Sequence, residues 1–167
     1  FVTCVYNYNL AEYVKNGYGK HVYFSEENIT AFRKNKDFTE IQKQRIVLKI
    51  LILHTIIKLH YEHIKEYDVY HNPLLLTLVN SVNTEDSDLE IFFKELAHFA
   101  KNPTDTILFE EVKEELIKEL KSQSKTFFDE KKIVDNDEII DRVSVADVLK
   151  YVFNAETNGN IEVLMLP

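Results

Sequence analysis

The longest run of helically spaced apolar residues extends from Ile41 to Ile64. Thr39 and Gln42 stand three positions apart at its start, which is the spacing of a capping box. At 1.5 Å per residue, such a helix is roughly 37 Å long. The segment Tyr67 to Pro73 ends it, because a residue before proline avoids the helical region. The pattern predicts one long helix within residues 38–67 and an internal boundary directly after it.

Shorter apolar runs predict four further helices. They cover Leu10 to Lys15, a segment that opens at Ser87, about Ile107 to Phe128, and Val145 to Phe153. Ser87 with Glu90 and Ser144 with Asp147 have the spacing of capping boxes, which marks two of the starts. In the segment beginning at Ile107, one apolar seam is expected to face the interior, formed by Val112, Leu116 and Leu120.

The apolar run Leu74 to Val79 predicts a strand, because it is short, follows Pro73 and gives way to polar residues. The run Ile161 to Leu166 has the same character. Sequential strands joined by helical crossovers usually lie parallel, with right-handed connections. We therefore expect an α/β fold class, in which residues 72–167 hold these two segments as neighbouring parallel strands with covering helices.

Composition bears on whether the chain binds nucleic acid or a membrane. The chain has 167 residues and a formal net charge of −8, which excludes a general electrostatic attraction to nucleic acid or anionic membranes. The most apolar segment, Ile46 to Leu59, is interrupted by Lys49, His54 and Lys58 before the roughly 20 apolar residues that a membrane span needs. We therefore predict a core helix and no membrane association. The single cysteine, Cys4, fits a reducing, cytoplasmic location.

Candidate catalytic and metal-binding patterns are weak. No acidic third ligand completes a metal motif around the four clustered histidines, His54, His60, His63 and His71. The acidic stretch DNDEIID, Asp135 to Asp141, has no preceding strand to aim its carboxylates at magnesium, which favours a solvated loop and a helix start. A phosphate-binding G-x-x-x-x-G-K-[ST] motif is absent. We expect no catalytic residue, metal site or cofactor site in this chain.

Two stretches carry a family resemblance: YNYNLAEYVKNGYGKHV at residues 6–22 and NPLLLTLVNSVNTEDSDLEIFF at residues 72–93. The first is similar to the segment that leaves the first RecA-like domain in the helicase-translocase (Res) subunits of type III restriction-modification enzymes and related DEAD/DEAH-box proteins. The second resembles the first strand and loop of their second RecA-like domain. This family carries a long linking helix between the two, which Phe38 to Tyr67 resembles.

The resemblance implies that the chain is an internal fragment of an ATP-dependent DNA helicase or translocase subunit of a type III restriction endonuclease. Residues 1–71 would be the inter-domain connecting segment, and residues 72–167 the N-terminal part of a partial RecA-like domain. The nucleotide-binding motifs would precede Phe1, and the arginine motif and nuclease would follow Pro167. ATP, Mg²⁺, DNA and a modification (methyltransferase) subunit would then be cofactors and partners of the parent enzyme, and the fragment alone would be inactive.

By the same resemblance, the loop after the predicted strand would offer hydrogen-bond donors to a DNA phosphate from Asn80, Ser81, Asn83 and Thr84. Acidic residues that follow directly would repel a phosphate, namely Glu85, Asp86 and Asp88. A polar loop that only caps the next helix therefore stays open as an interpretation. The alternative function is a free-standing helical interaction module that binds a protein partner through its long helix.

Overall fold

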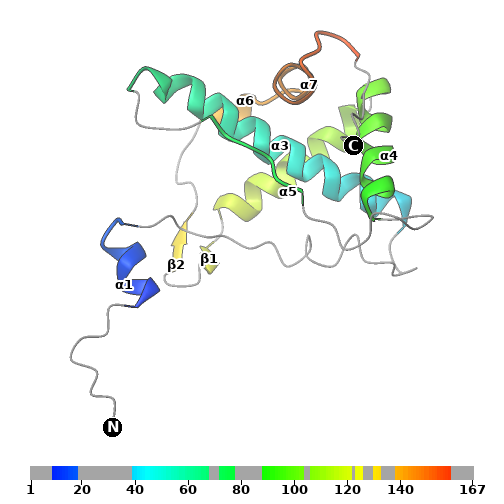
Figure 1. The fold of residues 1–167 in the computed structure, drawn as a ribbon. Coiled ribbons are helices and arrows are strands. Elements are labelled where there is room, and N and C mark those ends of the chain that lie inside the picture. Colours follow the sequence, from blue (N-terminus) through cyan, green and yellow to red (C-terminus); the bar gives the residue numbers. More distant parts are fainter. Residues whose placement is uncertain are drawn as a thin grey trace, which may run out of the picture.

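The fold is organised around one long helix, α3 (Glu40–Ile64), which runs through the centre of Figure 1. The computed structural model describes residues 9–18, 39–67, 72–77, 88–103, 106–121, 123–125, 130–132 and 138–158. In these ranges α3 is contacted by α4 (Asp88–Lys101), α5 (Thr106–Lys121), α6 (Glu138–Arg142) and α7 (Val145–Phe153). Short elements complete the description: α1 (Leu10–Lys15), the 3₁₀ helix η1 (Lys65–Tyr67), β1 (Gln123–Lys125) and β2 (Glu130–Lys132).

Local sequence explains where two of these helices begin. The backbone N–H of Thr39 donates to Gln42 Oε1 at 2.8 Å, and the N–H of Gln42 donates to Thr39 Oγ1 at 3.3 Å. Ser144 and Asp147 make the same reciprocal pair at the start of α7. Each box satisfies N–H groups that have no partner inside the helix. The predicted capping boxes at Thr39 and Ser144, and the long helix that follows Thr39, are confirmed.

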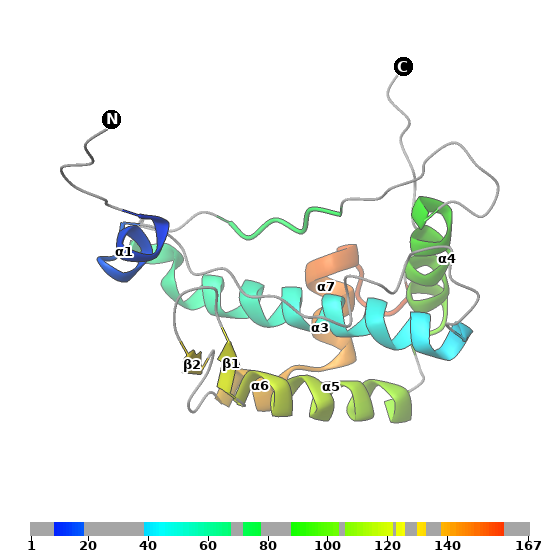
Figure 2. The ribbon, with the colours of Figure 1, turned by 90° about the horizontal axis from the view of Figure 1, so that it is seen from below.

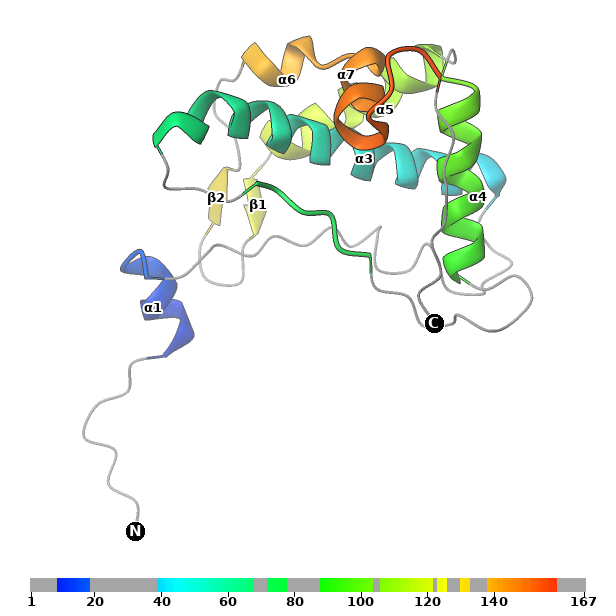
Figure 3. The ribbon, with the colours of Figure 1, turned by 45° about the horizontal axis from the view of Figure 1, so that its top comes forward.

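The middle of α3 is buried around much of its circumference. Buried positions occur at successive residues as well as at helical spacing: Ile46, Val47, Leu48, Lys49, Leu51, Ile52, Thr55 and Ile56. A helix that is apolar on several sides has to be covered on each of them. In Figure 3, α6 and α7 lie along one side of α3 while α4 crosses its N-terminal part. The surrounding helices therefore share one core with α3.

The predicted inner seam of α5 is confirmed, and Phe109 extends it by one turn. All four seam residues are buried in the same core as α3: Phe109, Val112, Leu116 and Leu120. Ile140 of α6, Val148 of α7 and Val143 between the two helices close that core. The spacing of three and four residues places the α5 side chains on one face, which is the face that meets α3.

Ion pairs align α5 with α3. Arg45 contacts both Glu111, at 2.8 Å, and Glu115. One turn further along α3, Lys49 donates to Glu119 at 2.6 Å. The partners follow the same order in both helices, so the helices run parallel, as Figure 2 shows. Lys49 is only 6% exposed, and a buried ammonium group requires such a partner.

The predicted α/β fold class is wrong. The described part of the chain is largely helical, and its one sheet is the antiparallel pair β1–β2, with Gln123 opposite Lys132. Of the predicted strand Leu74 to Val79, residues 74–77 have no regular secondary structure, and 78–79 lie outside the described residues. An apolar run becomes a strand only when a neighbouring strand accepts its hydrogen bonds. Here the helices of the core cover α3 instead, and no parallel RecA-like sheet is formed in the described ranges.

One further expectation is wrong, and others are not tested. The helix predicted to reach Phe128 ends at Lys121, and residues 123–125 form β1 instead. The predicted strand Ile161 to Leu166 and the proposed cap Ser87 lie outside the described residues. Within the described helices, none is long and apolar enough to cross a membrane.

Substitution of Phe109 tests whether α5 packs into the core. Its side chain is 1% exposed, whereas that of the nearby Ile107 is 73% exposed. We expect Phe109→Ala to lower the free energy of unfolding by about 3–5 kcal/mol, because it removes buried apolar contacts and leaves a cavity. Ile107→Ala should change it by less than about 0.5 kcal/mol. Urea denaturation followed by circular dichroism measures both, and equal effects would contradict this packing.

Candidate functional site

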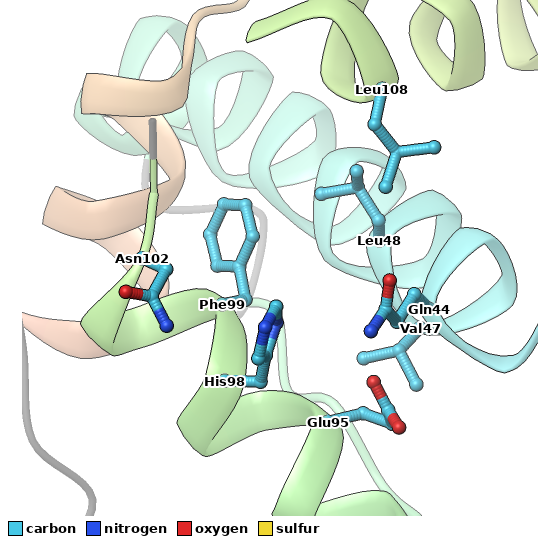
Figure 4. A pocket seen from close by; sticks show the side chains of 8 residues that line it. All are labelled: Gln44, Val47, Leu48, Glu95, His98, Phe99, Asn102 and Leu108. Atoms are coloured by element: carbon cyan, nitrogen blue, oxygen red, sulfur yellow. The ribbon is translucent and has the colours of Figure 1, made fainter. Parts of the chain in front are cut away.

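A pocket lies where α3, α4 and the first turn of α5 meet. Figure 4 shows its walls: Gln44, Val47 and Leu48 come from α3, Leu108 comes from α5, and the remainder come from α4 and the residue that follows it, namely Glu95, His98, Phe99 and Asn102. The cavity measures about 50 Å³. One wall is held in place by a ring contact between α4 and α7, in which the centroids of Phe99 and Phe153 are 6.0 Å apart. Polar and apolar groups thus face a common space.

Glu95 is the unusual member of the pocket. The residue is 8% exposed, and its Oε2 atom is buried without a hydrogen-bond partner among the described residues. Buried carboxyl oxygens normally have a partner, because an unsatisfied polar atom costs free energy. A proton on the Glu95 carboxyl group itself, shared with the neighbouring Glu40, reduces that cost.

A second carboxyl group, that of Glu40, lies beside Glu95. Burial raises the pKa of Glu95, and the negative charge of Glu40 and a hydrogen bond to it raise this pKa further. Lys43, which donates to Glu40 at 2.8 Å, lowers the pKa of Glu40. The two carboxyl groups are therefore unequal: Glu95 holds a proton more readily, and Glu40 is the charged partner. Two carboxyl groups that share a site in this way retain a proton between them more readily than isolated ones do.

The position of Glu95 follows from the apolar stripe of α4. Phe92 lies one turn before it and Phe99 one turn after it, and Phe92 is buried against the core. Residues at these spacings share one face of a helix. The spacing of Phe92, Glu95 and Phe99 therefore predicts a carboxyl group on the inward face of α4. The sequence analysis did not identify Glu95 or His98.

Residues 72–77 form a second candidate site. They run along the side of α3 opposite to α5 (Figure 2), tied to it by a hydrogen bond from Lys58 to the side chain of Asn72. Leu75 packs against the core, whereas Leu74 and Leu76 are 84% and 73% exposed. Within the described residues, 73–77 make no backbone hydrogen bond. This leucine segment therefore presents unpaired backbone and two apolar side chains.

Most of the residues singled out from the sequence cannot be compared with these two places. Asn80, Ser81, Asn83 and Thr84 lie outside the described residues, as does His71. His54 is half-buried on α3, and burial lowers its pKa, with a smaller contribution from the charge of Lys58. Over the described ranges, no group of three or more potential metal ligands is found. The DNA-contact loop stays a prediction.

Comparisons with known proteins leave the family open. No family model, curated protein or solved structure matches the chain. The resemblance to the type III restriction family therefore stays a prediction, and the two sites are interpreted from their own geometry.

Replacing Glu95 by Gln tests its raised pKa through stability. A carboxyl group whose pKa is higher in the folded than in the unfolded chain stabilises the fold at low pH, and this contribution is lost as pH rises through the folded pKa. Gln keeps the shape, donates to Glu40 and cannot ionise. We expect Glu95→Gln to be more stable than the wild type at pH 7, with the difference shrinking as pH falls below the ordinary pKa of Glu, about 4.3.

Thermal melts from pH 4 to pH 8 measure this difference. The matched control is Glu114→Gln, which makes the same charge change at an exposed position of α5. It should show no comparable pH-dependent gain. A Glu95→Gln protein that is less stable than the wild type at pH 7 would contradict the assignment.

Proposed function

We propose that the chain is a helical piece of a larger DNA-translocating enzyme of the type III restriction family, and that the leucine segment, residues 72–77, is where another part of that enzyme attaches. The observation that carries the proposal is the exposure of Leu74 and Leu76 on a stretch of backbone that makes no backbone hydrogen bond within the described part of the chain. One element supports it: the long helix α3 occupies the place at which the resemblance puts a linking helix.

The attachment would use strand pairing. Leu74 and Leu76 face solvent while Leu75 faces the core, which is the two-residue alternation of a strand with one buried face. Unpaired N–H and C=O groups on such a segment accept an extended segment from another chain or region, and the exposed side chains add apolar contact. This role needs no parallel sheet inside the chain itself.

The proposal assigns no ATP chemistry to the chain. Its sequence has no phosphate-binding loop, so ATP and Mg²⁺ would be bound elsewhere in the parent enzyme. DNA and the modification subunit are likewise proposed partners of the parent. The proposed DNA-backbone contacts of Asn80, Ser81, Asn83 and Thr84 belong to the same hypothesis.

A second candidate function is a free-standing interaction module that binds a different protein. The exposed leucines favour it equally, because they would serve any partner that offers an extended segment. The two functions differ in where the added strand comes from. In the first it belongs to the same enzyme, and in the second to an unrelated polypeptide.

The purified chain provides the first test. We expect it neither to bind nor to hydrolyse ATP with or without DNA, because it lacks the backbone cradle that binds nucleotide phosphates. Isothermal titration with ATP and a phosphate-release assay measure these properties. A DNA-stimulated ATPase activity that stays with the chain through several purification steps would contradict the proposal.

The leucine segment provides the second test. We expect the double variant Leu74→Lys, Leu76→Lys to bind the attached segment or partner with a dissociation constant at least tenfold higher. Burying each leucine in that interface is worth roughly 1.5–3 kcal/mol. Thermal stability should change little, since both side chains are exposed. Ile107→Lys is the matched control, because Ile107 is also 73% exposed but lies on α5.

A photo-crosslinking amino acid at position 76 distinguishes the two functions. In cells that express the open reading frame containing this sequence, a cross-link to another part of the same polypeptide or to its modification subunit supports the enzyme piece. A cross-link to an unrelated protein, lost in the leucine double variant, supports the interaction module. No cross-link above that of a probe at position 107 would contradict both.

A further inference from the structure

We propose that α4 is a pH-responsive element: when the carboxyl group of Glu95 releases its proton, α4 separates from the N-terminal part of α3 while the rest of the core stays folded. The separation uncovers Val47 and Leu48, which line the pocket between the two helices. This is a conformational property of the fold, and nothing in the proposed function requires it.

An ionisable group stands in the middle of the contact between α4 and α3. Glu95 is 8% exposed and lies between Phe92 and Phe99 on the inward face of α4. Phe92 belongs to the core, and Phe99 packs against it. Within the described part of the chain, Oε2 of Glu95 is buried without a hydrogen-bond partner. A neutral carboxyl group is tolerated at such a position, whereas a carboxylate has to be paired or return to water.

The groups that face Glu95 from α3 disfavour its ionised form. Glu40, the first residue of α3, places a negative charge beside Glu95 and shares a hydrogen bond with it. Lys43 is the nearby cation on the same helix, but its ammonium group binds Glu40 at 2.8 Å. The charge of Lys43 lowers the pKa of Glu95 less than burial and Glu40 raise it. Ionised Glu95 therefore meets a second carboxylate across the contact.

The basic groups of α4 itself do not reverse this balance. His98 lines the same pocket, and its charge lowers the pKa of Glu95, although burial and the charge of Glu40 each have a larger effect in the opposite direction. Lys94 is paired with Glu90 at 2.8 Å. The closed arrangement of α4 on α3 is thus the one that keeps Glu95 neutral.

α4 can open without unfolding the core, because its attachments are fewer than those of α5. Its main contact with another helix is the one with α3. From α5 the pocket receives only the apolar Leu108, and from α7 the ring of Phe153 contacts Phe99. α5, in contrast, is joined to α3 by the ion pairs of Arg45 and Lys49 as well as by its buried seam. Elements with fewer tertiary contacts open at a lower free-energy cost than the whole fold.

The pH dependence has a defined direction. Burial and the charge of Glu40 raise the pKa of Glu95 in the closed arrangement. A group with a raised pKa stabilises the closed arrangement at low pH, and this contribution is lost as pH rises through the pKa of the closed form. The opening of α4 therefore begins to increase above the ordinary pKa of a glutamate side chain, about 4.3.

Hydrogen–deuterium exchange of the full chain, read by mass spectrometry of peptides from α4 and α5, measures the opening of each helix separately. Exchange rates are divided by the intrinsic rate at each pH, which gives protection factors. We expect those of α4 to fall at least fivefold from pH 4 to pH 8, while those of α5 change less than twofold. Equal changes in the two helices, or no change in α4, would overturn the proposal without any variant.

Four variants identify the group that titrates. Glu95→Gln should make the protection of α4 independent of pH, whereas Glu114→Gln, the same change at an exposed position of α5, should keep the wild-type response. Glu40→Gln should reduce the response without removing it, because burial of Glu95 remains. His98→Asn should keep it. A response that survives Glu95→Gln, is unchanged in Glu40→Gln or is lost in His98→Asn would contradict the assignment to the Glu40–Glu95 pair.

Discussion

The need to cover α3 on several sides is the constraint on which the rest of the structure depends. A helix with one apolar stripe needs one neighbour, but the buried stretch from Ile46 to Ile56 leaves no broad polar face in its middle. α5, α7, α6 and α4 each remove part of that surface from water. Because burial of apolar surface is the main favourable contribution to folding, the positions of these helices follow from α3.

Charged residues decide how the covering helices are aligned. Lys49 lies within the buried stretch and would destabilise the core without the carboxylate of Glu119. Arg45 adds contacts to the same helix one turn earlier. Apolar packing alone permits α5 to slide along α3, whereas these pairs specify one register and a parallel direction. The exposed pairs contribute little stability by themselves, so their role is alignment.

Both candidate sites lie where this coverage is incomplete. At the N-terminal part of α3, the crossing of α4 leaves a pocket, and the apolar face of α4 carries Glu95 into it. Beside the C-terminal half of α3, the leucine segment buries Leu75 but leaves Leu74 and Leu76 in solvent. One site therefore holds a buried carboxyl group beside a second one. The other exposes two leucine side chains on backbone that has no hydrogen bond among the described residues.

The sequence by itself determined the helices, because their signals are local. Capping boxes at Thr39 and Ser144 and the seam of α5 depend on residues three or four positions apart, and each is found in the structure. Only the tertiary structure decided whether the run at Leu74 became a strand, since that requires a partner that is distant in the chain. The pairing of Glu40 with Glu95 joins α3 to α4 across 55 positions and has no local signature. Local hydrogen bonds and periodicity can be read along a chain. Burial, and which charged groups lie next to one another, are decided only when the chain has folded.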